Sequence, residues 1–372
     1  MVTKIIHVFV FMIFGSLIFC ALPLEADIST SVKLTLLNTL SRAQQGDWGF
    51  YGLGTGRVTF KADKYKNIRA QLSMDAQVAD TVLFDISRAF VKARFPGFRV
   101  TVGKARVSWG EGFIYNAGDV IFGAAASSVD MTAEELRDEA AWLTSLYVPL
   151  GTYSFFETIV LAPELNLSEL IADPDAETPR IADTRAGGRL VARVIGVKTE
   201  GGYLYRGGEQ THNPYLSFQG HLLVDWHLSG TVSIPHDPGG SSGIARSVAV
   251  SLGLFHMYKF PDDSTLSFRL EGLIKPAAPW SEDNSGPGDE GYALMLYPEI
   301  VWAVSDSLVF IFRNIVSPVD LSALITTGVN WNIYEGLNIL GLAAIQAGEE
   351  SDTYGWNKPG CIAVSAGFQF IY

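Results

Sequence analysis

The sequence predicts an all-β fold, a transmembrane antiparallel β-barrel of about 16–18 strands in one domain over residues 27–372. Three observations predict it. Runs of about 8–14 residues alternate apolar with polar side chains, which is the period of a β-strand. Short and long links between these runs alternate along the chain. The chain also ends in alternating apolar residues with an aromatic residue last.

Composition narrows the class of protein. The 372 residues are 48% hydrophobic but only 18% charged, against roughly a quarter charged in soluble proteins. Beyond the N-terminus, no stretch reaches the ~20 consecutive apolar residues of a membrane helix, which argues against a multi-span helical protein. The net charge of −12 gives no basic footprint for nucleic acid. These observations favour a chain that spans a membrane with strands.

Residues 1–26 resemble a secretory signal peptide. Lys4 precedes the apolar run IIHVFVFMIFGSLIF, and small residues follow it. We expect cleavage after Ala26, with Ala21 as the second choice; a lipidated Cys20 and an uncleaved anchor helix are the alternatives. Cleavage would leave Cys361 as the single cysteine, so a disulfide within one mature chain is excluded.

The stretch STLSFRLEGLIK, residues 264–275, shows the alternation most clearly. One face is apolar, and the other carries Arg269, Glu271 and Lys275. Two structures fit this pattern: a sheet packed on a soluble core, and a barrel strand with lipid outside and water inside.

Link lengths favour the barrel. Short links lie at 62–67, 95–97, 149–152, 195–200, 260–264, 304–306 and 333–336. The links that alternate with them are mostly longer, at 109–138, 163–183, 207–213, 236–243, 276–290 and 347–359. Outer-membrane barrels have short periplasmic turns and long external loops, whereas a soluble sandwich has no reason to keep such a parity.

The C-terminal segment CIAVSAGFQFIY places Phe368, Phe370 and Tyr372 on one face of a closing strand. An aromatic ring such as that of Tyr372 is favoured at the membrane interface. The segment resembles the C-terminal assembly signal of bacterial outer-membrane β-barrels. The resemblance implies that the barrel-assembly machinery recognises these three residues and that the protein lies in the bacterial outer membrane. The alternative is a buried terminal strand of a soluble sheet.

A second resemblance covers residues 84–120 and 184–214, which are similar to segments of porin-type families. The matching residues in the first segment include Gly103, Lys104, Trp109, Gly110, Gly112, Asn116 and Asp119. Ala105 and Ala117 depart from that pattern, where such families often carry Gln and Pro. The resemblance implies a rim or constriction at Trp109, Gly110, Gly112, Asn116 and Asp119, passage of small hydrophilic solutes, and a homotrimer as one candidate assembly.

Elementary chemistry adds two expectations about this segment. Glycines beside Trp109 let the chain turn sharply at the rim or fold inward. We expect Trp109 to be an interface anchor, with a solute-stacking platform as the alternative.

Charged side chains on the predicted strands should point inward, because a charge on the lipid face costs roughly 2–4 kcal/mol near the midplane. This requirement is weakest for Arg88, Lys92 and Arg94, which lie near the FPG turn. An inward basic ladder would line a pore and favour anions. An equally open alternative is that lumenal carboxylates such as Glu271 and Asp85 neutralise these basic side chains. The candidate pore-lining residues are Lys104, Arg106, Arg189, Arg193, Arg269, Glu271 and Lys275.

The charged residues of the predicted loops are mainly acidic, so their charge is opposite in sign to that of the basic ladder. The segment DMTAEELRDE, residues 130–139, starts with a possible capping box, so we expect a short helix that lies across the mouth or folds into it. A solvated loop surface is the plainer interpretation of such acidic runs. No calcium-loop spacing, metal-binding histidine pair or nucleophile elbow occurs, so we expect no metal, no cofactor and no enzymatic activity.

The function we predict from the sequence is a porin-like channel for passive diffusion of small hydrophilic solutes through a partly basic lumen. Two alternatives stay open: a transporter of hydrophobic or amphipathic molecules, and a non-conducting surface structural or adhesion barrel. The expected partners are outer-membrane lipid, the barrel-assembly machinery and small hydrophilic solutes, with no nucleic acid.

Overall fold

A computed structural model describes residues 28–42, 47–65, 67–79, 81–126, 136–163, 180–236, 248–281, 292–350, 352–356 and 360–372. The predicted signal peptide, residues 1–26, lies outside the described residues. Among the described residues, no helix is long and apolar enough to cross a bilayer. One short 3-10 turn, η1, covers Ile181–Asp183, and the remaining elements are strands.

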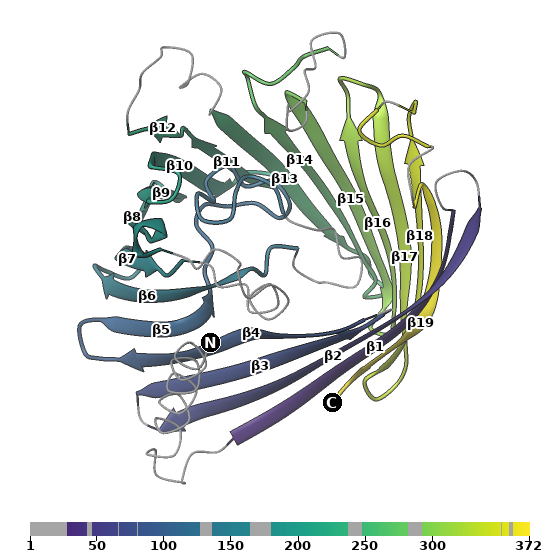
Figure 1. Cartoon of the computed structure of the whole chain (residues 1–372), viewed down its shortest axis with the longest axis horizontal. Helices are drawn as coiled ribbons and strands as arrows, with labels where there is room; N and C mark the ends of the chain where they lie inside the picture. The colour runs from purple at the N-terminus through teal and green to yellow at the C-terminus, as the bar shows by residue number, and fades with distance from the viewer. Residues whose placement is uncertain are drawn as a thin grey trace.

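The strands are long and follow one another directly (Figure 1). Their bounds are β1 Ile28–Arg42, β2 Trp48–Tyr65, β3 Ile68–Val78, β4 Val82–Arg94, β5 Arg99–Arg106, β6 Ala140–Pro149, β7 Phe155–Leu161, β8 Arg185–Val194, β9 Val197–Arg206, β10 Thr211–His221, β11 Asp225–Thr231, β12 Ile234–Pro235, β13 Ala249–Lys259, β14 Thr265–Ile274, β15 Leu294–Ser305, β16 Leu308–Ser317, β17 Ser322–Tyr334, β18 Leu337–Ala347 and β19 Ile362–Ile371.

The sheet closes on itself. Every strand pairing is antiparallel, and β1 pairs with β2 and also with β19, so the first and last strands, at the two ends of the colour scale in Figure 1, lie side by side. β11 and β12 both pair with β10, so a break at residues 232–233 divides one strand position into two. The described residues therefore form a closed barrel of 18 strand positions, which confirms the predicted fold class.

The predicted parity of the links is confirmed as well. The short links that the sequence predicted all fall at one end of the barrel, where both β1 begins and β19 ends, and two tight links that it missed, 79–81 and 318–321, lie at the opposite end. All the long links fall at the other end. The prediction missed three tight links, at residues 79–81, 222–224 and 318–321. We call the two ends the short-turn end and the long-loop end.

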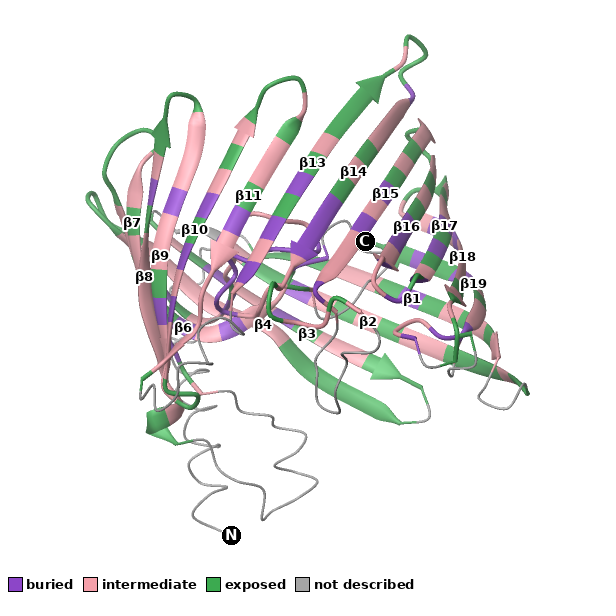
Figure 2. Cartoon of the chain, turned by 90° about the horizontal axis from the view of Figure 1, so that it is seen from above, coloured by how far each residue is buried: buried purple, intermediate pink, exposed green. Residues whose placement is uncertain are grey.

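Alternation along each strand separates an outer from an inner face, visible as bands of different burial in Figure 2. In β14, Phe268 and Leu270 are exposed on the outside, whereas Arg269 and Glu271 face inward. The same outward parity holds for Phe310 and Phe312 of β16 and for Trp331 of β17 among others. A closed barrel with a continuous apolar exterior satisfies its backbone in lipid without an edge.

The last strand continues this exterior. Phe368 and Phe370 pair in register with Leu36 and Leu34 of β1 and are exposed on the outer face. Between them, Gln369 is buried on the inner face, where its Nε2 donates a 3.3 Å hydrogen bond to Thr35. Tyr372 exchanges two backbone hydrogen bonds with Val32, so the chain end is fixed in the ladder.

Candidate functional site

The candidate site is a loop that leaves the barrel wall after β5 and folds into the lumen, where Figure 1 shows it inside the ring of strands. We call residues 107–126 and 136–139 the inward loop. Residues 127–135, which carry most of the predicted acidic helix, lie outside the described residues. The described remainder of that segment, residues 136–139, is not helical, so the helix is not found there.

Glycine makes the entry into the loop possible. Gly110 has a φ of +70°, and a Cβ on it would lie 2.5 Å from Asn116 Oδ1 and 2.7 Å from the Cα of Gly118. An L side chain would be strained there and would clash with backbone. The loop therefore doubles back on itself at the position that the sequence marked as a rim or constriction.

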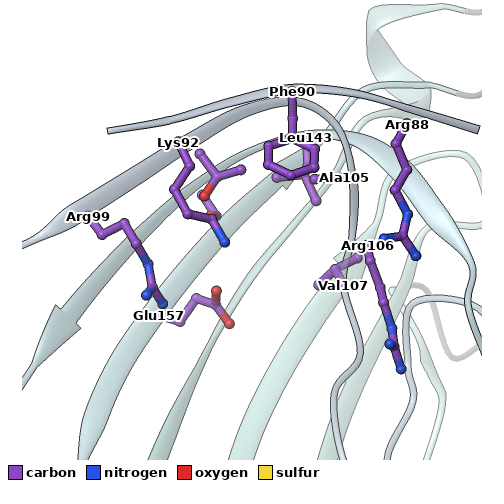
Figure 3. A pocket seen from close by; sticks show the side chains of 11 residues that line it. Arg88, Phe90, Lys92, Arg99, Ala105, Arg106, Val107, Leu143 and Glu157 are labelled. Carbon is purple, nitrogen blue, oxygen red and sulfur yellow. The ribbon is translucent and has the colours of Figure 1, made fainter. Parts of the chain in front are cut away.

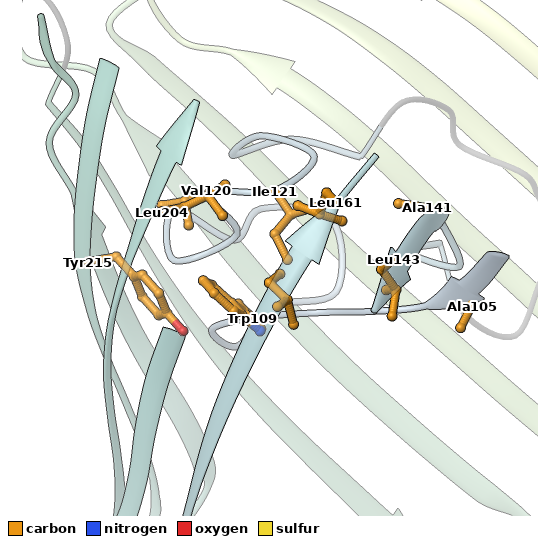
Figure 4. Packing of buried hydrophobic residues seen from close by; sticks show 10 residues of the cluster. Ala105, Trp109, Val120, Ile121, Ala141, Leu143, Leu161, Leu204 and Tyr215 are labelled. Carbon is orange, nitrogen blue, oxygen red and sulfur yellow. The ribbon is translucent and has the colours of Figure 1, made fainter. Parts of the chain in front are cut away.

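Trp109 anchors the first part of the loop by packing. Its ring is fully buried inside the barrel and stacks on Tyr215 of β10, with centroids 5.8 Å apart and planes at 25° (Figure 4). Val120, Ile121, Leu161 and Leu204 belong to the same buried cluster. Trp109 thus does not lie at the lipid interface, in contrast to the expected interface anchor, because the glycines turn it inward instead. Buried as it is, the ring offers no surface for solute stacking either.

Glu200 of β9 receives the same part of the loop by hydrogen bonds. Its buried carboxylate accepts an N–H from Gly110 at 2.8 Å and the hydroxyl of Tyr215. Arg189 of β8 bridges Glu200 at 3.0 Å and Glu157 at 2.8 Å, and it also donates to the carbonyl of Ser108. Several donors thus compensate a buried carboxylate whose desolvation would otherwise be costly.

Glu271 of β14 holds the next part of the loop. This carboxylate, only 1% exposed, accepts three consecutive backbone N–H groups, from Phe113 and Ile114 at 2.8 Å and from Tyr115 at 3.0 Å. Ser251 of β13 accepts a fourth, from Ala117, at 2.8 Å. Glu271 does face the lumen as expected, but the inward loop covers it, so it is a backbone anchor and not an open pore-lining charge.

The motif residues Asn116 and Asp119 hold the loop's own shape. Asn116 donates from Nδ2 to the carbonyl of Trp109 at 2.8 Å and accepts from the N–H of Gly118. Asp119 forms a buried ion pair with Arg137 at 2.8 Å. Arg137 also donates to the carbonyls of Ile114 and Gly123, which ties the two described parts of the loop together. Gly112 lies in the same turn, close to the carbonyl of Tyr115.

Arg269 is compensated rather than free. Its guanidinium lies 3.1 Å from Glu299 of β15 and 3.5 Å from the ring centroid of Phe113 in the inward loop. Glu299 also binds Arg313 of β16 at 2.7 Å and accepts the hydroxyl of Tyr297. This network favours the neutralisation hypothesis over an open basic ladder for the β14–β16 side.

The other predicted candidates lie apart from this network. Arg193, exposed near the short-turn end, has its guanidinium 5.2 Å from the ring centroid of Tyr153. Lys275 lies directly after β14 at the long-loop end and is half-buried. Lys104 is 3.2 Å from Asp85. The structure therefore does not bring the candidate basic residues into one continuous ladder.

A different set of basic residues does meet, on the inner face of β2–β5, which we call the basic wall. Phe90, Lys92 and Arg88 of β4 share the inner face with Thr101 and Arg99 of β5 through the strand register. A pocket of about 230 Å³ lies here, lined by Arg88, Phe90, Lys92, Arg99, Thr101, Ala105, Arg106, Val107, Leu143, Ser145 and Glu157 (Figure 3). Arg106 is the one residue that this pocket shares with the candidates predicted from the sequence.

The sequence held a signal for two of the missed residues. Arg88 and Lys92 were separated from the ladder because they stand near a turn, yet strand spacing puts both on one face with Phe90, and a pair of charges on the lipid side would be costly. Among the described residues, no group of three or more His, Cys, Asp and Glu side chains is arranged to hold a metal ion.

Comparison with known proteins supports the fold and leaves the family open. No protein-family model and no curated protein matches the chain. Solved structures do match over nearly the whole chain. Acinetobacter baumannii OccAB1 is 10% identical with a TM-score of 0.56, covering 94% of this chain and 98% of that one. OccAB3 of the same organism is 8% identical with a TM-score of 0.55, covering 93% of this chain and 99% of that one. Pseudomonas aeruginosa OccD3 is 7% identical with a TM-score of 0.54, covering 92% of this chain and 91% of that one. At such identities the likeness concerns the barrel fold alone.

Proposed function

We propose that the protein is an outer-membrane, porin-like channel through which small hydrophilic solutes diffuse passively, with a preference for anions. The observation that carries the proposal is the state of the inward-facing charges on the basic wall. The side chains of Arg57 and Arg106 remain 45% and 38% exposed although both lie inside a closed barrel. Charged groups with that much accessible surface require water in the lumen.

The barrel's dimensions agree with a wet lumen. Barrels of 16–18 strands leave an aqueous channel, unlike eight-strand barrels whose side chains fill the interior. The inward loop reduces this space from one side, because Trp109, Glu200 and Glu271 hold it against the wall formed by β7–β16. The basic wall is left to face the passing solute.

Charge on the basic wall favours anions. Four bases line its pocket, Arg88, Lys92, Arg99 and Arg106, against the single acid Glu157. Glu157 is itself bound by Arg189 at 2.8 Å. Cationic residues that line a pore lower the barrier for anions and raise it for cations. We infer that the pocket is the most anion-favouring position along the described lumen.

The remaining parts of the proposal follow from location. The apolar exterior supports insertion in lipid, and the exposed faces of Phe368 and Phe370 support recognition of the last strand by the barrel-assembly machinery. We further propose export by cleavage of residues 1–26 and, by analogy with porins, assembly as a homotrimer. The long-loop end would then face outward and the short-turn end the periplasm.

The test is single-channel conductance of the folded protein in a planar bilayer, combined with swelling of liposomes in small sugars. We expect stable open steps and swelling that slows as the sugar becomes larger. If the folded, inserted barrel gave neither conductance steps nor swelling, the channel function would be contradicted. The two alternatives, transport of amphipathic molecules and surface adhesion, would then be the functions to test.

A further inference from the structure

Asp138 lies next to the last residue of the inward loop and contacts two arginines of the pocket. Its Oδ1 accepts a hydrogen bond from Nη2 of Arg88 and lies 3.6 Å from Nε of Arg106. Both arginines line the pocket on the basic wall (Figure 3). One carboxylate therefore holds two of the four cations that would attract an anionic solute.

The preceding residue fixes Asp138 in this place. Arg137 is buried and binds the other part of the loop through Asp119 and through the carbonyls of Ile114 and Gly123. With Arg137 tied to the loop, Asp138 contacts the basic wall. The two neighbouring residues thus connect the inward loop to the pocket, one by a buried ion pair and one by a half-exposed one.

We propose that Asp138 is a tethered counter-ion that competes with anionic solutes for Arg88 and Arg106 and so sets the strength of the anion preference. The inference rests on the proposed channel function. An anion that enters the pocket needs the same N–H donors that Asp138 occupies, since a guanidinium binds oxyanions through those groups. A half-exposed ion pair is weak enough to exchange its carboxylate for a solute.

Other lumenal acids differ from Asp138 in their partners. Glu157 is held by Arg189, Asp75 binds Arg57 at 2.7 Å outside the pocket, and Asp85 binds Lys104 at 3.2 Å. In the part of the chain that the structure describes, Asp138 is the acid that forms ion pairs with two cations of the pocket. It is therefore the specificity-determining acid in this account.

The experiment measures reversal potential in a KCl gradient for the wild type and three single variants. Asp138→Asn removes the counter-ion while keeping the shape of the side chain. Asp75→Asn makes the same charge change inside the lumen but outside the pocket. Asp263→Asn makes it in the turn after β13, where Asp263 pairs with Lys259.

We expect Asp138→Asn to raise the chloride-to-potassium permeability ratio by roughly threefold, because two guanidiniums are freed at once. Its conductance should also saturate at a lower KCl concentration, as a stronger anion site fills earlier. Asp75→Asn should have a smaller effect, and Asp263→Asn should match the wild type.

Two results would overturn the inference: an Asp138→Asn channel with wild-type selectivity, or an equal change in Asp75→Asn. Asp138→Ser repeats the test if the asparagine variant does not fold. A wild-type protein that inserts but does not conduct would instead contradict the proposed function, so the two failures are distinguishable.

Discussion

The two walls of the lumen carry the same residue types in opposite states. Under the inward loop, Arg313 and Glu299 are each 4% exposed and bind one another at 2.7 Å. On the basic wall, Arg57 binds Asp75 at the same distance, yet remains 45% exposed. An arginine on the inner face of a barrel can thus stabilise the structure or face the solute. Which of the two it does depends on whether the inward loop covers it.

Strand parity alone therefore does not identify a pore-lining charge. Arg269 and Arg106 were both expected to line the pore, but Phe113 covers the first, whereas the second lines the pocket. Variants on the two walls should therefore differ in whether they change stability or selectivity.

Removing the carboxylate of Glu271 should have the largest effect. Glu271→Ala leaves three backbone N–H groups, two of them fully buried, without an acceptor, and each buried unsatisfied group costs about 1–3 kcal/mol. We expect the inward loop to detach, with noisier and larger conductance and faster proteolysis near residues 113–117. Glu209→Ala, at an exposed turn beside Arg206, is the control. Quiet, wild-type channels from Glu271→Ala would show that the loop does not depend on this anchor.

Gly110→Ala should act on the same loop through its backbone. The positive φ and the contact with Gly118 predict a cost on the order of 1–3 kcal/mol. The midpoint of unfolding in urea would report it. Gly151→Ala, in an open turn where a Cβ meets nothing within 4 Å, should leave the midpoint unchanged. Equal midpoints for both variants would argue against a tightly constrained turn at Gly110.

On the basic wall, neutralising charge should change selectivity and leave stability nearly intact. The double variant Lys92→Gln with Arg99→Gln removes two of the pocket's four bases. We expect the chloride-to-potassium permeability ratio to fall roughly threefold, with an unchanged unfolding midpoint. Lys259→Gln, at the exposed end of β13, is the control for loss of a single positive charge. If the double variant kept the wild-type selectivity, the anion preference would have to arise elsewhere in the channel.

The smallest effect concerns pH at the long-loop end, outside the strands. Asp320 accepts hydrogen bonds from Ser322 and from the N–H of Thr353. Burial raises the pKa of Asp320, but hydrogen bonds from Ser317, Thr353 and Ser322 outweigh it and hold the pKa below its usual value.

Because this pKa is lowered on folding, the stabilisation is present above the unfolded carboxyl pKa of about 3.9 and is lost as the pH falls through the folded value. Amide exchange at Thr353 should be faster in Asp320→Asn than in the wild type at neutral pH, and the difference should vanish in strong acid. A difference independent of pH would contradict this role.

The sequence predicted the repetitive part of the structure well. Period-two runs, link parity and the aromatic C-terminus were enough to predict a closed barrel, because the alternation within each strand shows which of its residues share a face. The break at 232–233 escaped detection, since it interrupts the hydrogen-bond ladder to β10 and leaves the apolar pattern intact.

The site could be predicted only in part, because its contacts are distant along the chain. Glu271 meets the inward loop across more than 150 residues, and Glu200 meets Gly110 across 90. No local pattern contains that information. The motif around Trp109 predicted a rim or constriction, but whether its ring faced lipid or the lumen depended on Tyr215, which belongs to a strand far downstream.

The most direct test of the two-wall account compares Arg106→Gln with Arg269→Gln by reversal potential in a KCl gradient, on protein shown to be folded. Arg106→Gln should lower the anion preference, because its guanidinium faces the pocket. Arg269→Gln should leave the preference unchanged, because Glu299 and Phe113 cover that charge. Equal shifts from both variants, or a shift from Arg269→Gln alone, would contradict the account.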